Sequence, residues 1–126
     1  MQNEEAIILR VCRQARRMAL KKLGTVDGYC IDISNFINSN LIKYNIETKL
    51  VYGVFRLDYD LHNGKKIPYI PSHDDAHTWV EWKGIPIDAS ADQFNTHLTT
   101  KNKVKAIVFG TNLDRFLDWD FDPIYK

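Results

Sequence analysis

The fold is decided by the sequence AHTWVEWKGIPIDA, which occupies residues 76–89 of the 126-residue chain. Two stretches rich in β-branched and aromatic residues flank Lys83-Gly84, and such a pair suits the two-residue turn of a β-hairpin. This turn sets Val80 opposite Ile87, and the same register gives the hairpin one largely apolar face. The sequence therefore predicts two antiparallel strands in a fixed register.

The opposite face of this hairpin carries His77 and Trp79. The predicted register places Asp88 opposite Trp79 and diagonal to His77, within reach of its side chain. A carboxylate that holds an imidazole fixes its tautomer and stabilises its cation, as a general base requires. The alternative interpretation is a surface His–Asp pair beside a packed tryptophan.

Two helices are predicted before the hairpin. Apolar residues recur at three- and four-residue steps over residues 3–23, with Asn3 as the N-cap and Gly24 as the stop. A second pattern of this kind begins at Cys30 and ends at Asn45. The first pattern places Cys12 on its apolar face, so we expect Cys12 in the core.

A basic face lies opposite the apolar face of the first helix and consists of Arg10, Arg13, Arg16, Arg17, Lys21 and Lys22. Such a face is most often solvated, and that is the prediction here. Contact with nucleic acid or with an acidic partner is the alternative.

Cys30 follows Gly28-Tyr29 and occupies the start of the second helix. Unpaired backbone N–H groups and the positive end of the helix dipole favour a thiolate at such a position. A small core residue is the alternative role for a cysteine on an apolar helical face.

The remaining segments are predicted to complete an antiparallel sheet. Residues 46–57 read as a strand with a possible bulge at Gly53, and residues 104–109 as a short buried strand. Residues 58–75 form a long connection, with a hairpin arm and a loop that faces the substrate. Residues 112–126 are interpreted as a helical turn and a docking tail. Helices followed by antiparallel strands predict the α+β class.

Composition limits the classes of protein that fit. The length predicts a single domain over residues 1–126, and the net charge of +1 makes nucleic acid an unexpected partner. Two cysteines do not form a disulfide framework, and no apolar stretch is long enough to cross a membrane. The polar, acidic start lacks the features of a signal peptide, so a cytoplasmic location is expected.

Three stretches resemble the transglutaminase-like branch of the papain-like cysteine enzymes, in its small single-domain bacterial or phage type. They are GYC at residues 28–30, HTWVEW at residues 77–82 and GIPIDASADQF at residues 84–94. The resemblance covers residues 28–94 and implies a catalytic helix packed on a small antiparallel β-sheet. It also implies thiol chemistry without a metal or organic cofactor, and a structural role for the Asp-Gln-Phe at residues 92–94.

The resemblance implies a role for each site residue. Cys30 is the nucleophile, His77 the general base and Asp88 the group that orients His77. Trp79 and Tyr29 are candidates for substrate binding or for a wall of the site. The expected reaction is hydrolysis of a peptide, isopeptide or glutamine carboxamide bond through a thioester, on a protein or peptide substrate.

Two other functions fit the same residues. The first is a catalytically inactive transglutaminase-like fold that binds a protein partner. The second is a metal site formed by His73, Asp74, Asp75 and His77, with Asp88 as a further ligand. Ligands that lie four residues apart in a loop are scattered, which disfavours the metal site.

Overall fold

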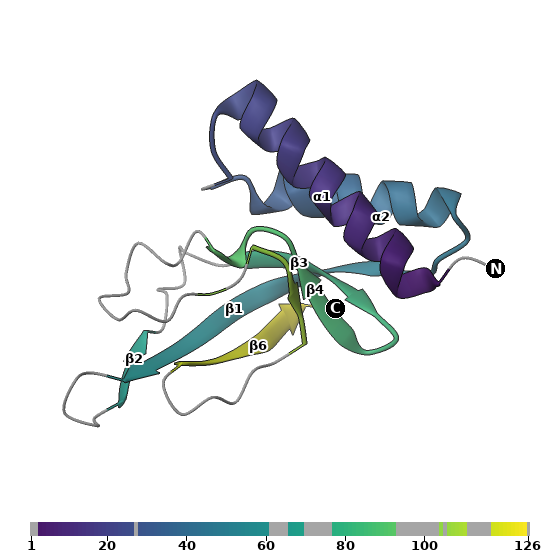
Figure 1. Ribbon diagram of the computed structural model, residues 1–126. Helices are drawn as coiled ribbons and strands as arrows, with labels where there is room; N and C mark the ends of the chain where they lie inside the picture. Colours follow the sequence, from purple (N-terminus) through teal and green to yellow (C-terminus); the bar gives the residue numbers. More distant parts are fainter. Residues whose placement is uncertain are drawn as a thin grey trace.

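The computed structural model describes most of the chain. Backbone is described for residues 3–26, 28–60, 66–69, 77–92, 104, 106–110 and 117–125, and side chains for these residues except 56–60, 66–69, 117–120 and 122–125. The α+β class is confirmed, because two α-helices lie on one side of an antiparallel sheet (Figure 1).

Both helices begin where the sequence predicts. In α1 (Glu4–Leu23) the Asn3 side chain accepts a hydrogen bond from the backbone N–H of Glu5 at 2.9 Å, so Asn3 is the N-cap. Gly24 ends the helix with φ of 76°, a left-handed conformation that glycine adopts without strain. α2 (Cys30–Lys43) begins at Cys30 itself, so the thiol is carried by the first helical residue.

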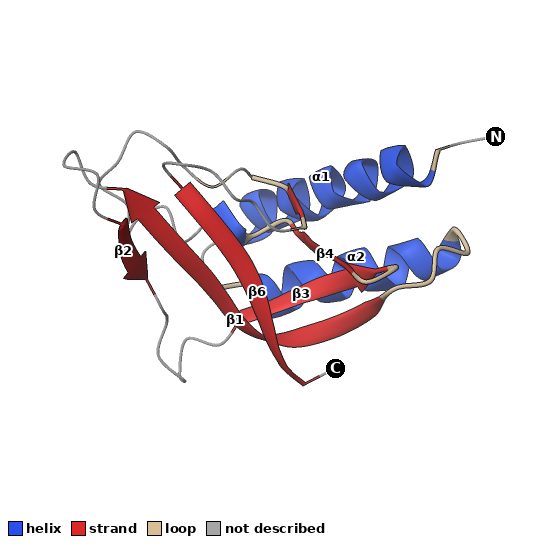
Figure 2. Cartoon of the chain, turned by 90° about the horizontal axis from the view of Figure 1, so that it is seen from below, coloured by secondary structure: helices blue, strands red, loops and turns tan. Residues whose placement is uncertain are grey.

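The sheet has six strands in the order β2-β1-β3-β4-β5, with β6 also paired to β1. The strands are β1 (Lys49–Asp60), β2 (Lys66–Tyr69), β3 (His77–Trp82), β4 (Ile85–Asp88), β5 (Val108–Phe109) and β6 (Leu117–Tyr125). Each strand pairing in the described part of the chain is antiparallel, and Figure 2 shows the sheet with both helices behind it.

The register predicted for the central hairpin is confirmed. Val80 pairs with Ile87 across β3 and β4, and the turn residues Lys83 and Gly84 have φ of 50° and 77°. Positive φ at both positions is the geometry of a type I′ turn, which matches the twist of the two strands.

β1 has the predicted length of twelve residues but lies three residues further along the chain than expected, and three strands pair with it. Its first half pairs with β3, and its second half pairs with β6 and with the arm formed by β2. The register against β6 shifts between Tyr52 and Gly53, which confirms the irregularity expected at Gly53. The arm lies within the predicted connection, whereas residues 61–65 and 70–76, including the expected substrate-facing loop, lie outside the described residues.

The prediction of a helical turn and a docking tail is wrong for residues 117–125, and the rest of 112–126 lies outside the described residues. Residues 117–125 form strand β6 beside β1, and Phe121 is buried at 8% exposure. Apolar Leu117, Trp119 and Phe121 alternate with aspartates, which is the two-residue period of a strand. The strand predicted over residues 104–109 is confined to β5 within the part described.

Two hydrophobic clusters bury opposite faces of the sheet. Val80 and Ile87 belong to the cluster that packs against both helices. Trp79 and Phe55 belong to the other cluster, together with Phe121. Because neighbouring residues of a strand point to opposite faces, the change from Trp79 to Val80 crosses the sheet. The hairpin is therefore buried on both sides, and any polar residue on it needs a partner.

Candidate active site

The start of α2 presents the Cys30 thiol at the positive end of a helix. Tyr29 occupies the N-cap position, but its side chain makes no capping hydrogen bond. This differs from α1, whose first turn is capped by Asn3. Uncapped N–H groups at the first turn favour a negative charge close to them. The half-buried Cys30 side chain is in that position.

Cys30 contacts the first two residues of strand β3. The His77 side chain and the Thr78 backbone both interact with its thiol and lower its pKa. Four residues further along the same helix face, the Ser34 hydroxyl donates a hydrogen bond of 3.1 Å to the backbone carbonyl of Thr78. These contacts fix the start of α2 against the start of β3.

His77 is held on its other side by Asp88. The Nε2 atom of His77 contacts the Oδ2 atom of Asp88 in the neighbouring strand, and each residue is 1% exposed. Because Nε2 faces the carboxylate, Nδ1 is the ring nitrogen that remains for the thiol. The alternative of a surface His–Asp pair is thus wrong, since both residues are buried.

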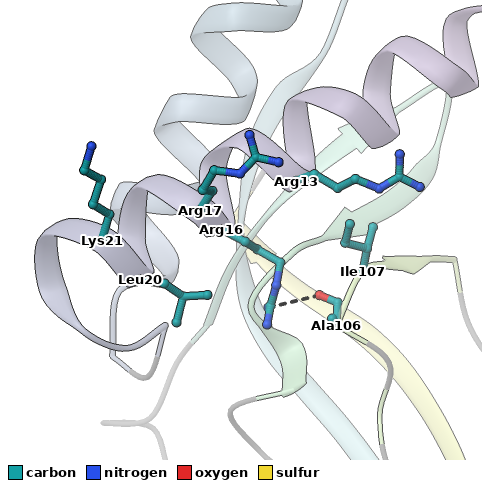
Figure 3. Close-up of a pocket in the computed structure, with 7 residues that line it drawn as sticks. All are labelled: Arg13, Arg16, Arg17, Leu20, Lys21, Ala106 and Ile107. Carbon is teal, nitrogen blue, oxygen red and sulfur yellow. Dashed lines mark hydrogen bonds between the residues drawn. The ribbon is translucent and has the colours of Figure 1, made fainter.

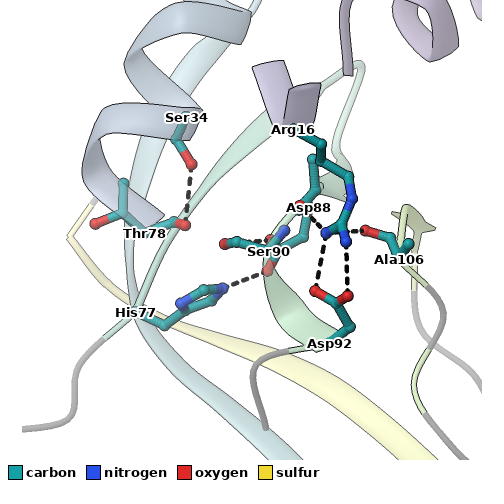
Figure 4. A network of polar contacts seen from close by, with 9 residues as sticks. Arg16, Ser34, His77, Thr78, Asp88, Ser90, Asp92 and Ala106 are labelled. Carbon is teal, nitrogen blue, oxygen red and sulfur yellow. Dashed lines mark hydrogen bonds and ion pairs between the residues drawn. The ribbon is translucent and has the colours of Figure 1, made fainter. Parts of the chain in front are cut away.

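Ser90 orients the Asp88 carboxylate. Its backbone N–H donates a hydrogen bond of 2.8 Å to Oδ1 of Asp88, and its hydroxyl donates one of 3.1 Å to the same atom. Oδ2 is therefore left to His77, as Figure 4 shows. Sequence reasoning missed Ser90, although an Asp followed two residues later by Ser is a known local turn motif.

The charges of this group shift the pKa values of the thiol and the imidazole in opposite directions. Burial opposes protonation of His77, but the charge of Asp88 and its hydrogen bond outweigh burial and raise the pKa of His77 to about 10. Burial alone would raise the pKa of Cys30, but the hydrogen bond and the positive charge of His77 lower it. Both shifts act toward a thiolate beside an imidazolium.

Arg16 supports the turn that follows Asp88. Its guanidinium binds both carboxylate oxygens of Asp92, at 2.9 and 2.8 Å, and also donates to the backbone carbonyl of Ala89 at 2.7 Å. A further bond of 3.2 Å reaches the carbonyl of Ala106 (Figure 4). The prediction of a wholly solvated basic face is wrong for Arg16, because its side chain is only 17% exposed. The structural role expected of Asp92 is confirmed.

Trp79 and Tyr29 both lie beside the site but differ in exposure. The Trp79 ring centroid is 6.2 Å from that of His77, and Trp79 is 1% exposed. Trp79 thus forms an inner wall behind His77, and its burial excludes direct contact with a substrate in this structure. Tyr29 is half-buried, precedes Cys30 and packs against the helix-facing cluster.

Cys12 is in the core, as the sequence predicts. It is 0% exposed within the helix-facing cluster, and its burial raises the pKa of its thiol to about 12. The charge of Asp88 acts in the same direction, while Arg13 opposes it.

The proposed metal ligands are not gathered by the part of the chain that is described. His73, Asp74 and Asp75 lie outside it, and no three metal-ligating side chains of the described residues share a site. Among those same residues, no helix is long and apolar enough to span a membrane.

No family model, curated protein or solved structure matches the chain. The site is therefore interpreted from its own geometry.

Proposed function

We propose that the chain is a thiol-dependent acyl-transfer enzyme with a Cys30–His77–Asp88 triad on a transglutaminase-like, papain-like core. One observation carries the proposal: the Cys30 thiol contacts His77, and the Nε2 atom of His77 contacts the Asp88 carboxylate. Removing a histidine and a carboxylate from water costs free energy that an apolar pair would not cost. A functional need for the pair accounts for its presence in the core.

The protonation states at neutral pH suit a nucleophile. The raised pKa of His77 and the lowered pKa of Cys30 favour the thiolate without help from a substrate. Asp88 keeps the imidazolium in place, and Ser90 keeps Asp88 in place.

The reaction has two halves that share a thioester. In the first, the Cys30 thiolate attacks the carbonyl carbon, a C–S bond forms, and the C–N bond breaks as His77 gives its proton to the leaving amine or ammonia. In the second, neutral His77 takes a proton from water, and the resulting hydroxide attacks the thioester. The C–S bond breaks, which releases the carboxylic acid and regenerates the thiolate and the imidazolium.

The start of α2 supplies the groups that stabilise the oxyanion. The backbone N–H of Cys30 lies in the uncapped first turn, together with those of Ile31 and Asp32. Donors of this kind are fixed before the substrate arrives, so they stabilise the developing charge without reorganisation. This chemistry requires no metal or organic cofactor.

Hydrolysis of a peptide, isopeptide or glutamine carboxamide bond in a protein or peptide is the reaction we favour, since water is always present as the acceptor. A cytoplasmic, reducing environment would keep the thiol free for it.

Iodoacetamide labelling at neutral pH tests the nucleophile. We expect rapid alkylation of Cys30 and almost none of Cys12 in the folded protein, measured by peptide mapping with mass spectrometry. Cys12 is the internal control, because it lies in the same chain. Slow and equal labelling of both cysteines would contradict the proposal and favour the inactive binding module.

A substrate panel in heavy-oxygen water then identifies the reaction. The panel contains glutamine peptides, lysine isopeptides and unmodified peptides, each with and without an added primary amine. Hydrolysis places heavy oxygen in the new carboxylate, with ammonia released from glutamine and a peptide fragment from a peptide bond. Transfer places the added amine in the product instead. The Cys30→Ala variant should give none of these products.

A further inference from the structure

We infer that the outer face of α1 binds an acidic peptide segment of a partner protein, in a groove that lies away from the thiol and does not depend on the proposed function. The groove has a volume of about 710 Å³ and runs between α1 and the segment that leads into β5. Its α1 side is formed by Arg13, Arg17, Leu20 and Lys21, and we call it the basic groove.

Three cations of the basic groove have no carboxylate partner within the described part of the chain. Arg13, Arg17 and Lys21 are exposed and follow one another at four-residue steps along one helix face. No ion pair links them to a carboxylate of the described residues. Like charges at this spacing destabilise a helix. The three cations therefore do not stabilise the helix, whereas an anionic ligand would offset the repulsion between them.

Two apolar side chains also line the groove. Leu20 is 50% exposed, and Ile107 borders the groove from the other side. Leu20 therefore offers an apolar contact beside the cations. A ligand that contacts both the cations and Leu20 must carry carboxylates close to an apolar side chain. A short acidic peptide provides this combination.

Arg16 shows that this helix face already binds a carboxylate. Its guanidinium holds Asp92 by two hydrogen bonds, and it also reaches the Ala106 carbonyl across the groove (Figure 3). Arg16 is therefore already paired, and its bond to Ala106 joins α1 to the segment on the other side of the groove. Arg13 and Arg17 flank it in sequence and carry the same fork of donors, which suits a carboxylate of a partner.

A peptide fits this groove better than a nucleic acid. The described lining contains no aromatic ring on which a base could stack, and the chain has a net charge of only +1. The volume is that of a site for a few residues rather than for a long track of phosphates.

Fluorescence anisotropy with a labelled octapeptide of alternating glutamate and leucine tests the inference, on the full chain at low ionic strength. We expect saturable binding that weakens about tenfold or more in the Arg17→Glu/Lys21→Glu variant. The matched control is Arg10→Glu/Lys22→Glu, which makes the same change in net charge on the same helix outside the basic groove. It should change the affinity by no more than about twofold, as remote charges are screened.

Two further binding measurements distinguish an acidic peptide from other ligands of the basic groove. A peptide with glutamine in place of glutamate should lose binding, and Leu20→Ser should weaken the acidic peptide while circular dichroism shows an intact helix. The milder Arg17→Gln/Lys21→Gln variant serves if the charge reversal unfolds the protein. Equal losses in the groove and control variants would overturn the inference. So would tighter binding of a labelled oligo-thymidine, or concentration-dependent self-association that the peptide does not compete.

Discussion

The two cysteines of this protein occupy opposite chemical environments, although the charge of Asp88 acts on both thiols. Cys12 is fully buried among apolar side chains, and its pKa is raised to about 12. Cys30 lies at an uncapped helix start beside His77, and its pKa is lowered. Burial opposes the thiolate in both places. The difference comes from His77, which lowers the pKa of Cys30, whereas at Cys12 the charge of Arg13 is the smallest of the three influences.

Asp88 takes part in both environments. Its negative charge raises the pKa of both thiols directly, and it also holds the His77 cation that lowers the pKa of Cys30. Asp88 therefore affects the contrast between the two thiols through His77. The predictions that follow are attempts to remove or reverse this contrast.

Replacement of each cysteine by alanine should give the largest effect. For any substrate found with the panel, we expect Cys30→Ala to lower turnover by at least about 10⁴-fold, because the covalent route is lost. Cys12→Ala should keep turnover within about threefold, since the residue supports only packing. Steady-state kinetics on the two variants and the parent chain measure both effects. Substantial turnover by Cys30→Ala would exclude the mechanism.

Asp88→Asn should reduce the contrast without removing either thiol. An amide cannot stabilise the His77 cation, so we expect turnover to fall by about 10²-fold or more. The alkylation rate of Cys30 at neutral pH should fall toward that of Cys12, and its pH profile should move to higher pH. Asn38→Ala, on the same helix as Cys30 and away from the site, is the control. An unchanged pH profile in Asp88→Asn would mean that Asp88 does not act through His77.

The features that could be predicted from the sequence are those formed by residues close together in the chain. The Lys83-Gly84 turn and the alternation around it fix the register of β3 and β4 locally, so His77 and Asp88 could be placed together. The position of Cys30 at a helix start was likewise a local inference. The burial of the pair was not predictable, because the second cluster that covers it includes Phe121 of β6.

The errors concern partners that are distant in the chain. β6 pairs with β1, and the period of two in its sequence could have identified a strand but not its neighbour. Arg16 is 76 residues from Asp92, so its helix pattern gave no sign that it leaves the solvated face. Both errors come from tertiary contacts that decide what a locally ambiguous segment does.

Stability should show the reverse of the activity contrast. Cys12→Ser places a hydroxyl in a fully buried apolar site without an acceptor of its own, which should cost about 1–3 kcal/mol of the free energy of unfolding. Cys30→Ser, at a half-buried position, should change it by less than about 0.5 kcal/mol. Urea titrations followed by circular dichroism measure both. A larger loss for Cys30→Ser than for Cys12→Ser would contradict the assignment of Cys12 to packing and Cys30 to chemistry.

The smallest expected effect is a pH dependence of stability, which is best measured in the Cys30→Ala background so that the thiol does not titrate. Burial lowers the pKa of His77, but the charge of Asp88 and its hydrogen bond outweigh burial and raise the pKa from 6.5 to about 10. The folded state therefore binds the proton more tightly than the unfolded state. The contribution of His77 to the free energy of unfolding is thus complete below about pH 6.5 and is lost as the pH rises through the pKa of the folded state. In the Cys30→Ala background this pKa lacks the contribution of the thiol and rests on Asp88. We expect the melting temperature to fall by a few degrees over this interval.

Adding Asp88→Asn should flatten the curve, because the imidazolium then loses the partner that raises its pKa. A melting temperature that falls equally in both variants would assign the pH dependence to other groups and leave His77 neutral in the resting site.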